Sequence, residues 1–476
     1  MWLVIARVVA RYPRLGLNAA MTHSIVRTLQ SCARQHSASR WLVGFSGGLD
    51  STVLLHSLSA AQLGVPVIAV HVHHGLSPNA DSWQRHCQTV CDSLQVPLLT
   101  QRLGLHSATG NLEERARQAR YQAINELTQP GDVVLLGHHR DDQAETLLYR
   151  LMRGAGVKGL AAMGEQRHLG NVSLWRPLLN YSRAELLAYA REQDLQWIED
   201  ESNEQLHFDR NYLRQQVLPA LTERWPEASK AMAQSAEHCR EAQSLLTDLA
   251  ILDSQQLAER PEPGGYSVDL AHLRALPPRR QKNYLRFWLD ERFGVSIGRQ
   301  AQVDIEQQLL AEGASVAARI SVVDVQLCCF ANRLYALDAR AQWAPRTDEP
   351  SLLWQSVAEP LALPGGDCLS LIPVHHIGIN CMGIHPDGLT GKVEVRWRQG
   401  GERCQPAGRA HSQTLKKLLQ EYQVPTWLRP RVPLLFIDGD LAAVGDYWVN
   451  QAYAGKGAGA MALHWHFAAV QRPTSD

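Results

Sequence analysis

The chain lacks several features that would place it in a special class of protein. Its cysteines contain no Cys-x-x-Cys pair, which argues against a zinc ribbon, an iron–sulfur site and a disulfide framework and fits a reducing cytoplasm. The nine cysteines are Cys32, Cys87, Cys91, Cys239, Cys328, Cys329, Cys368, Cys381 and Cys404. No apolar run approaches the roughly 20 residues that span a bilayer. Lys and Arg number 47 together, as do Asp and Glu, so net charge gives no indication of a nucleic-acid partner.

The length of the chain indicates more than one domain. At 476 residues, with 45% hydrophobic and 20% charged residues, it suits two or three globular domains. The first segment carries Arg7, Arg11 and Arg14 and no acidic residue, a composition that organelle transit peptides share. The globular pattern begins at Met21, and a start of translation there is the simpler interpretation. We therefore expect residues 1–20 to be a non-native or unstructured leader.

The chain is organised around one glycine loop, Ser46-Gly47-Gly48-Leu49-Asp50-Ser51. The apolar residues 41–45 before it predict a buried strand, and residues 51–58 after it have helical spacing. A strand, a glycine turn and a helix N-terminus together bind phosphate, because glycine lets the backbone approach and the helix dipole favours the anion. A Walker A loop would need a lysine after its glycines, and none is present. Taken alone, Ser-Gly-Gly could also be an ordinary turn.

Strands and helices alternate around this loop. The predicted strands are 41–45, 67–72, 97–100 and 133–137, and the predicted helices are 24–35, 51–58, 78–95, 111–127 and 141–153. Because the strands are apolar throughout, they predict a doubly wound parallel α/β sheet, in which ligands gather at the carboxyl ends of the strands. The glycine loop, His73-His74 and His138-His139 fall at this edge. We assign His71, in the second strand, to the same nucleotide site.

A second motif, Gly137-His138-His139-Arg140-Asp141-Asp142-Gln143-Ala144-Glu145-Thr146, follows the fourth predicted strand. On a helix that begins near Asp141, Asp142 and Glu145 share a face. Two carboxylates with flanking histidines suit magnesium binding or removal of a proton from an amine. In the alternative interpretation, Asp141 and Asp142 cap the helix, Glu145 is solvated, and each histidine is structural.

The glycine loop resembles the SGGxDS loop of the ATP-pyrophosphatase (PP-loop) family, which cleaves ATP to AMP and pyrophosphate. Both motifs and their spacing, with further segments, resemble the tRNA(Ile)-lysidine synthase family. The resemblance is dense over residues 40–225, rests mainly on position in the middle third and returns near residue 415. The further segments are Arg153-Gly154-Ala155-Gly156, Gly159-Leu160, Arg176-Pro177-Leu178-Leu179, Asp200-Glu201-Ser202-Asn203, Arg210-Asn211-Tyr212-Leu213-Arg214, Leu415-Lys416-Lys417-Leu418-Leu419 and Val424-Pro425-Thr426-Trp427-Leu428-Arg429.

This resemblance implies a ligase that uses ATP to attach free L-lysine to C2 of the wobble cytidine in the CAU anticodon of tRNA(Ile). The product lysidine changes the codon read from AUG to AUA and the amino-acid identity from Met to Ile. Asp50 and Asp142 would bind Mg²⁺, or one of them would deprotonate the lysine amine, and Glu145 would contact lysine. His138 completes the catalytic set. The ATP phosphates would lie against the glycine loop, formed by Ser46, Gly47, Gly48, Leu49, Asp50 and Ser51.

Basic residues in three places are candidates for tRNA binding. Arg115 lies on the predicted helix 111–127. Arg210 and Arg214 are four apart on one helical face, where they contact either the tRNA backbone or the substrate pocket, or else form structural salt bridges with Asp200 and Glu201. Nearer the C-terminus, the candidates are Lys416, Lys417 and Arg429.

The C-terminal candidates belong to a segment, Lys392 to Arg431, that contains nine basic residues against three acids. Trp397, Tyr422 and Trp427 are interleaved with them, and basic residues with aromatics are typical of a nucleic-acid surface. The alternatives are a solvated face for the charges and a core position for the aromatics.

We expect three domains: a PP-loop catalytic domain over 21–226, a mostly helical tRNA-binding domain over 227–343, and a small, basic α+β tRNA-binding domain over 352–470. Three other functions remain open. A PP-loop sulfur transferase would normally use paired cysteines, which are missing here. A PP-loop amide ligase for a small metabolite would not need the basic C-terminal segment. A nucleotide-sensing tRNA-binding protein would release no pyrophosphate. The sequence leaves monomer and homodimer open.

Overall fold

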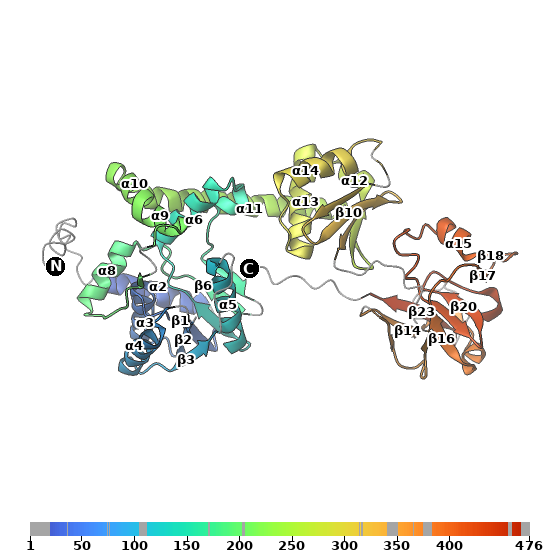
Figure 1. Cartoon of the computed structure of the whole chain (residues 1–476), viewed down its shortest axis with the longest axis horizontal. Coiled ribbons are helices and arrows are strands. Elements are labelled where there is room, and N and C mark those ends of the chain that lie inside the picture. Colours follow the sequence, from blue (N-terminus) through green and yellow to red (C-terminus); the bar gives the residue numbers. More distant parts are fainter. Residues whose placement is uncertain are drawn as a thin grey trace. The chain divides into compact units, whose positions relative to one another are not determined.

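The computed structural model describes residues 20–35, 37–73, 75, 77–103, 112–169, 172–201, 205–313, 315, 318–339, 351–364, 366–374, 383–455 and 459–467. The expected leader, apart from residue 20, and His74 lie outside these residues. The chain divides into two compact units, residues 1–245 and 246–475 (Figure 1). No helix among the described residues is long and apolar enough to cross a bilayer.

The first unit contains a six-stranded sheet in the order β3-β2-β1-β4-β6-β5. Neighbours from β3 to β6 are parallel, and only β5 is antiparallel to its neighbour β6. The predicted parallel sheet is thus confirmed, with an added hairpin at one edge that makes it mixed. The strands are β1 (Arg40–Gly44), β2 (Val67–His73), β3 (Leu98–Arg102), β4 (Asp132–Leu135), β5 (Gln166–Leu169) and β6 (Val172–Trp175).

Both faces of this sheet are buried, as parallel sheets require. In β1, the side chains of Trp41 and Val43 belong to one hydrophobic cluster and that of Leu42 to another, because successive residues of a strand point to opposite faces. The first cluster includes α3, α4 and α8, and the second includes α5. Figure 1 shows α3 and α4 on one side of the strands and α5 on the other.

The helices of this unit that surround the sheet are α2 (Ala20–Gln35), α3 (Leu49–Ala60), α4 (Ala80–Ser93), α5 (Leu112–Leu127), α6 (Arg140–Met152), α7 (Val157–Leu160) and α8 (Arg183–Glu192). A second group follows: α9 (Asp209–Tyr212), the π-helical segment η2 (Leu213–Val217), α10 (Leu218–Arg224) and α11 (Ala228–Ser254), which continues past residue 245.

The middle region, which opens the second unit, mixes helices with a five-stranded antiparallel sheet in the order β7-β8-β11-β10-β9. The expectation of a mostly helical region is therefore wrong. The sheet contains three hairpins that were not predicted. Pro263 and Gly264 join β7 to β8, and the other two turns lack glycine: Val323 and Asp324 join β9 to β10, and Ala331 and Asn332 join β10 to β11. Ala331 and Asn332 both have positive φ, as a type I′ turn requires. The elements are β7 (Arg260–Glu262), β8 (Gly265–Asp269), α12 (Leu270–Ala275), α13 (Pro278–Phe293), α14 (Arg299–Ile305), η3 (Glu306–Leu310), β9 (Arg319–Val322), β10 (Val325–Phe330) and β11 (Arg333–Asp338).

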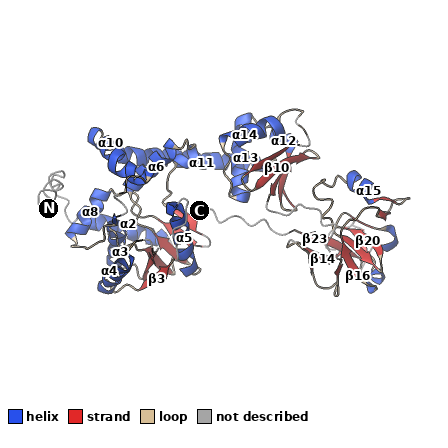
Figure 2. Cartoon of the chain, viewed as in Figure 1, coloured by secondary structure: helices blue, strands red, loops and turns tan. Residues whose placement is uncertain are grey.

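The C-terminal region consists mainly of strands (Figure 2). Two five-stranded antiparallel sheets, β12-β16-β19-β20-β21 and β13-β14-β23-β15-β22, contribute side chains to one hydrophobic cluster. The fold is therefore more purely antiparallel β than the expected α+β, with α15 (Leu415–Glu421) as its α-helix among the described residues. The strands are β12 (Leu352–Leu353), β13 (Leu361–Ala362), β14 (Cys368–Pro373), β15 (Gly383–Ile384), β16 (Val393–Arg396), β17 (Arg403–Cys404), β18 (Gln413–Thr414), β19 (Leu434–Ile437), β20 (Asp440–Val444), β21 (Trp448–Val449), β22 (Ala454–Gly455) and β23 (Met461–His466).

Candidate active site

The glycine loop connects β1 to the N-terminus of α3. Gly47 has φ +84°, and a Cβ there would lie 2.7 Å from Ile198 Cδ1 and 2.9 Å from Cys87 Sγ, so only glycine fits this turn. Gly48 is the N-cap of α3 and offers no side chain to the first turn. The unpaired N–H groups at a helix N-terminus then remain available to an anion. Ser46 and Ser51 flank the loop, with their hydroxyl oxygens 3.1 Å apart.

The end of β4 approaches the first turn of α3 closely. A Cβ on Gly137 would lie 3.0 Å from the carbonyl carbon and oxygen of Asp50. This absence of a side chain lets the two segments pack against each other and brings the histidines that follow Gly137 next to the glycine loop. The two sequence motifs therefore form one site.

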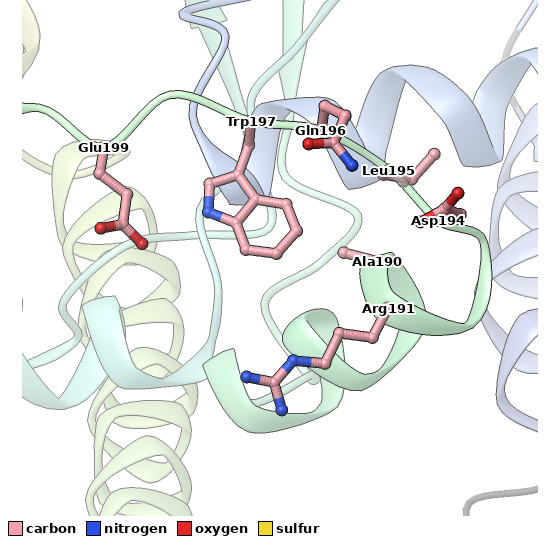
Figure 3. A pocket seen from close by; sticks show the side chains of 7 residues that line it. All are labelled: Ala190, Arg191, Asp194, Leu195, Gln196, Trp197 and Glu199. Atoms are coloured by element: carbon pink, nitrogen blue, oxygen red, sulfur yellow. The ribbon is translucent and has the colours of Figure 1, made fainter. Parts of the chain in front are cut away.

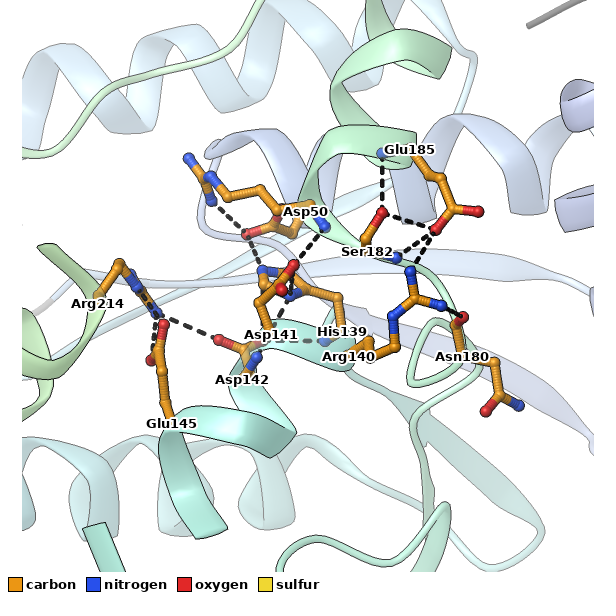
Figure 4. Close-up of polar contacts among 11 residues, drawn as sticks. Asp50, His139, Arg140, Asp141, Asp142, Glu145, Asn180, Ser182, Glu185 and Arg214 are labelled. Atoms are coloured by element: carbon orange, nitrogen blue, oxygen red, sulfur yellow. Dashed lines mark hydrogen bonds and ion pairs between the residues drawn. The ribbon is translucent and has the colours of Figure 1, made fainter. Parts of the chain in front are cut away.

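His139 lies at the centre of an acidic cluster, which Figure 4 shows. Its Nε2 is 3.6 Å from Oδ2 of Asp50 and 3.6 Å from Oδ2 of Asp142, and its Nδ1 is 3.8 Å from Oδ2 of Asp141. Burial lowers the pKa of His139, but the three carboxylates outweigh burial and raise it to about 9. His139 is therefore an imidazolium at neutral pH. Since an imidazolium has no acceptor nitrogen, the 3.4 Å approach of the Asp142 N–H to Nδ1 is then a contact and no hydrogen bond.

The carboxylates in turn are held by this histidine and by two arginines. Burial raises the pKa of Asp50, but His139 and the guanidinium groups of Arg183 and Arg214 reverse that shift, so the pKa is lowered overall. Arg183 Nη1 donates to Asp50 Oδ2 at 3.2 Å. Asp142 also caps α6, since its Oδ2 accepts from the His139 N–H at 2.9 Å. The capping interpretation of the motif is thus true of Asp142, which contacts the cluster at the same time.

Glu145 and Arg214 form a two-pronged ion pair beside this cluster, and their side chains point toward each other in Figure 4. Nε and Nη2 of Arg214 donate to Oε1 and Oε2 of Glu145 at 2.6 and 2.8 Å, and Nη2 also donates to Asp142 Oδ1 at 3.2 Å. Glu145 is 4% exposed, so it is no solvated surface residue. Burial raises the pKa of Glu145 and Arg214 opposes that shift; the bidentate geometry is that of a charged pair.

A cavity of about 710 Å³ opens beside these side chains. Six of the residues predicted from the sequence line it: His71, His138, Asp142, Glu145, Arg210 and Arg214. His138 accepts a hydrogen bond at Nδ1 from Arg176 Nε at 3.2 Å. Burial, with the nearby arginines, lowers its pKa far below the usual value, so His138 is neutral. His71 is buried, with its Nδ1 2.9 Å from the carbonyl oxygen of Phe45.

A smaller hollow of about 400 Å³ lies at the end of α8. Figure 3 shows the ring of Trp197 between the side chains of Arg191 and Glu199. This hollow contains none of the predicted site residues, and no histidine is among the seven residues that line it. The larger cavity is therefore the candidate active site.

The remaining residues predicted to bind tRNA do not line this cavity. Arg115 is exposed on α5, and Lys416 and Lys417 are exposed on α15 in the second unit. Arg429 donates its Nε–H to the carbonyl oxygen of Val424 at 2.9 Å. Their contact with tRNA stays a prediction.

Sequence reasoning missed Arg183 and treated His139 only as a flanking residue. Arg183 reaches Asp50 across 133 positions, and no local pattern indicates such a contact. The sequence did contain a signal for His139, because His138 precedes it directly and two acids, Asp141 and Asp142, follow it within three positions. In the alternative interpretation of structural salt bridges, Arg214 would pair with Asp200 and Glu201, but its acids are Glu145 and Asp142.

The cluster fits a magnesium ion bound together with a nucleotide. Oδ1 of Asp50 is buried without a hydrogen-bond partner, and Asp50 and Asp142 both approach the same nitrogen of His139. Mg²⁺ is commonly held by one or two carboxylates, with water and substrate phosphates completing the shell. Across the described ranges no group of three or more His, Cys, Asp or Glu is arranged to hold a metal alone, so phosphates would have to supply further ligands.

A parallel sheet with a glycine loop at the carboxyl end of β1, and no lysine in that loop, defines a PP-loop ATP-binding protein. The family model described as "PP-loop domain" matches residues 21–221. The models "TilS substrate binding domain" and "TilS substrate C-terminal domain" match residues 269–335 and 393–465. The chain belongs to the tRNA(Ile)-lysidine synthase family and is an ATP-dependent ligase.

Two relatives illustrate this membership. The tRNA(Ile)-lysidine synthase of Pseudomonas fluorescens is 42% identical over 447 residues, which cover 92% of this chain and 96% of the relative. That of Coxiella burnetii is 38% identical over 425 residues, which cover 88% of this chain and 92% of the relative. A solved structure of the U34-tRNA thiolase NcsA from Methanococcus maripaludis is 18% identical with a TM-score of 0.40, covering 46% of this chain and 79% of the other, too low to carry an argument.

Proposed function

We propose that this chain ligates free L-lysine to C2 of the wobble cytidine in the CAU anticodon of tRNA(Ile). The name of its relatives, tRNA(Ile)-lysidine synthase, supports this reaction. One observation carries it to the residues: the buried carboxylate of Glu145 lines a cavity that Asp142 also lines, and His139 lies 3.6 Å both from Asp142 and from Asp50 in the first turn of α3. A site for a cationic amine thus adjoins a site for phosphate.

The reaction would proceed in two steps. In the first, the C2 carbonyl oxygen of cytidine attacks the α-phosphate of ATP, and pyrophosphate leaves. In the second, the ε-amine of lysine attacks C2, the C2–O bond breaks, and AMP leaves with the former carbonyl oxygen. A carbonyl oxygen is a poor leaving group and AMP is a good one, which is why ATP is consumed. The ammonium form of lysine must lose a proton before it attacks, since its unperturbed pKa is about 10.4.

The residues divide between these steps. The backbone of the loop from Ser46 to Ser51 would hold the ATP phosphates. Asp50 and Asp142 would hold Mg²⁺, which would neutralise phosphate charge, or one of them would accept the proton of the amine. Glu145 would bind the ammonium group of lysine. Neutral His138 lines the same cavity. Because its Nδ1 accepts from Arg176, its Nε2 carries the proton and would donate a hydrogen bond to the substrate. His71 would contribute to the ATP site.

The rest of the chain would bind the tRNA. In this proposal residues 21–226 form the catalytic domain, and residues 227–343 and 352–470 form two tRNA-binding domains. Arg115, Arg210, Lys416, Lys417 and Arg429 would contact the tRNA backbone, because phosphate neutralisation supplies most of the affinity for nucleic acids. Arg214 differs from them, because its guanidinium already pairs with Glu145 and Asp142.

The test is incorporation of radiolabelled lysine into an unmodified isoleucine tRNA with a CAU anticodon. We expect labelling that requires ATP and that does not occur with elongator methionine tRNA, which shares the anticodon sequence. ATP cleavage stimulated by tRNA without lysine labelling would contradict the proposal and indicate another PP-loop reaction on tRNA. Labelling that survives deletion of residues 352–470 would contradict the role given to the basic segment.

A further inference from the structure

We propose that Arg214 is a built-in counter-ion that occupies the ammonium position of the active site until a cationic amine displaces it. This inference rests on the proposed function and adds a residue that sets substrate specificity. One guanidinium holds two acids: it is bidentate on Glu145 at 2.6 and 2.8 Å and reaches Asp142 at 3.2 Å. The same three side chains line the 710 Å³ cavity.

The carboxylate of Glu145 needs a cationic partner whether or not substrate is bound. Glu145 is 4% exposed, and a buried carboxylate without a partner is strongly unfavourable. Both of its oxygens accept from Arg214, so an incoming ammonium cannot make full use of them while the guanidinium stays. The substrate amine and Arg214 therefore compete for the same oxygens.

The geometry lets the arginine leave while the carboxylate stays. The side chain of Arg214 is 36% exposed and that of Glu145 is 5% exposed, so solvent reaches the arginine side chain far more than the carboxylate. Arg214 belongs to the π-helical segment η2, where the Leu218 N–H donates to the carbonyl oxygen of Leu213. The next residue, Pro219, has no N–H to restore the α-helical pattern. Such π-helical turns are frequent at functional sites.

The exchange discriminates between amino acids by charge. A cationic side chain that displaces Arg214 leaves the buried Glu145 paired with a cation, and Asp142 keeps His139 at 3.6 Å. A neutral or acidic side chain of similar length would leave Glu145 without its paired cation, so it cannot enter. Arg214 thus acts as a positioning residue. Only a cationic side chain competes with it for Glu145, and this competition weakens the affinity for lysine while it increases the selectivity for a cation.

The test measures lysine binding to the full chain by calorimetry, without ATP or tRNA. We expect Arg214→Gln to tighten lysine binding at least about tenfold, a usual size for coupling between two bound groups. Arg214→Lys, which keeps one charge but cannot bridge both acids, should tighten it less. Arg191→Gln is the matched control, because Arg191 is an exposed arginine of the same unit on the separate small hollow, and it should bind lysine as the wild type does.

Two further measurements, of melting temperature with lysine and with L-norleucine, complete the test. Lysine should raise the melting temperature of Arg214→Gln more than that of the wild type, and L-norleucine, which lacks the ammonium group, should raise neither. Equal or weaker lysine binding by folded Arg214→Gln, or by Arg214→Lys if the first variant does not fold, overturns the inference and leaves the proposed function intact. Absence of lysine binding in every variant overturns the proposed function and the inference together.

Discussion

The carboxylate–arginine cluster of the first unit and the basic segment of the second unit use the same side chains in opposite ways. In the cluster, Glu145 is buried and shares one arginine with Asp142. In the basic segment, Glu394 is flanked by Lys392 and Arg396, and at the surface the side chain of Arg409 pairs with Glu421 at 2.6 Å. The first arrangement concentrates charge beside a cavity, whereas the second leaves most of its charges at least partly exposed, with Glu394 and Arg431 as buried exceptions.

This difference shows how a count of charges along a sequence can mislead. The basic segment has nine cations against three acids, but each of those acids pairs with at least one cation. The cluster shows no excess of either sign in the sequence, yet its charges lie in a buried setting, where each interaction is stronger. Surface ion pairs contribute little to stability, whereas breaking a buried pair is strongly destabilising.

Neutralising Glu145 should have the largest effect. Glu145→Gln keeps the shape of the side chain but removes the charge that would hold the lysine ammonium, so we expect lysine labelling to fall about a thousandfold. Glu223→Gln is the matched control, because Glu223 is an exposed acid on α10. Near-normal labelling by Glu145→Gln, or by Asp142→Asn, would show that the carboxylate concerned is not needed for the reaction.

The charge of His139 should appear in the pH dependence of stability. Its folded pKa is about 9, above the unfolded value of about 6.5, so the stabilisation is complete below pH 6.5 and disappears as the pH rises through 9. The loss should approach about 3 kcal/mol in the free energy of unfolding.

Denaturant unfolding between pH 6 and 9.5, without magnesium, measures this loss. His139→Gln should flatten the curve over this range, because it removes the titrating group. The lowered pKa of Asp50 acts in a different window, since its stabilisation is present above the unfolded pKa and disappears as the pH falls below about 4. An unchanged slope between pH 6.5 and 9 in His139→Gln would mean that the imidazolium does not anchor the cluster.

Substituting Gly47 should destabilise the loop without changing any charge. Gly47→Ala places a Cβ against Ile198 and Cys87 at a residue with φ +84°, so we expect a loss of about 2 kcal/mol in the free energy of unfolding. Gly156→Ala is the control. Gly156 is the N-cap of α7 and has a negative φ, and the space around its Cβ position is open. Thermal melts compare the two. Equal melting temperatures would show that the loop relaxes around a methyl group.

The surface charges of the second unit should give the smallest effect. Lys416→Ala with Lys417→Ala should weaken tRNA binding about tenfold and reduce the salt dependence by roughly one to two phosphate contacts. Arg409→Gln with Glu421→Gln removes a paired cation and its acid together, so it should leave affinity nearly unchanged. Filter binding at several salt concentrations checks both. An equal loss in the two double variants would mean that paired and unpaired cations contribute alike.

The parts of the molecule that the sequence predicts well are those that depend on neighbouring residues. The four apolar runs became β1 to β4 within a few residues, and both motifs lie at the carboxyl edge of the sheet. The loop is recognised from Gly47, which its positive φ requires, and the second motif from the helical spacing of Asp142 and Glu145. Each motif can therefore be identified from neighbouring residues alone. The hairpin of β5 and β6 was not predicted, because Arg167, His168 and Ser173 interrupt the apolar pattern of these strands.

The rest depends on contacts between distant residues. Arg214 reaches Glu145 across 69 positions and Arg183 reaches Asp50 across 133, and spacing in the sequence says nothing about such pairs. The aromatic residues of the basic segment illustrate the same limit. Trp397 is buried, and Trp427 packs edge-on against Phe330 and Tyr335, so these two rings are packed inside the protein, whereas Tyr422 is exposed.

The thiol beside the glycine loop bears on how this protein responds to oxidants. Cys87 packs against Gly47 and His71, and burial raises the pKa of Cys87 and of Cys91 to about 12. Alkylation and peroxide oxidation both act on the thiolate, which is scarce at neutral pH when the pKa is so high. The glycine loop therefore packs against a sulfur atom, that of Cys87, which reacts slowly with oxidants, and Cys91 shares this low reactivity.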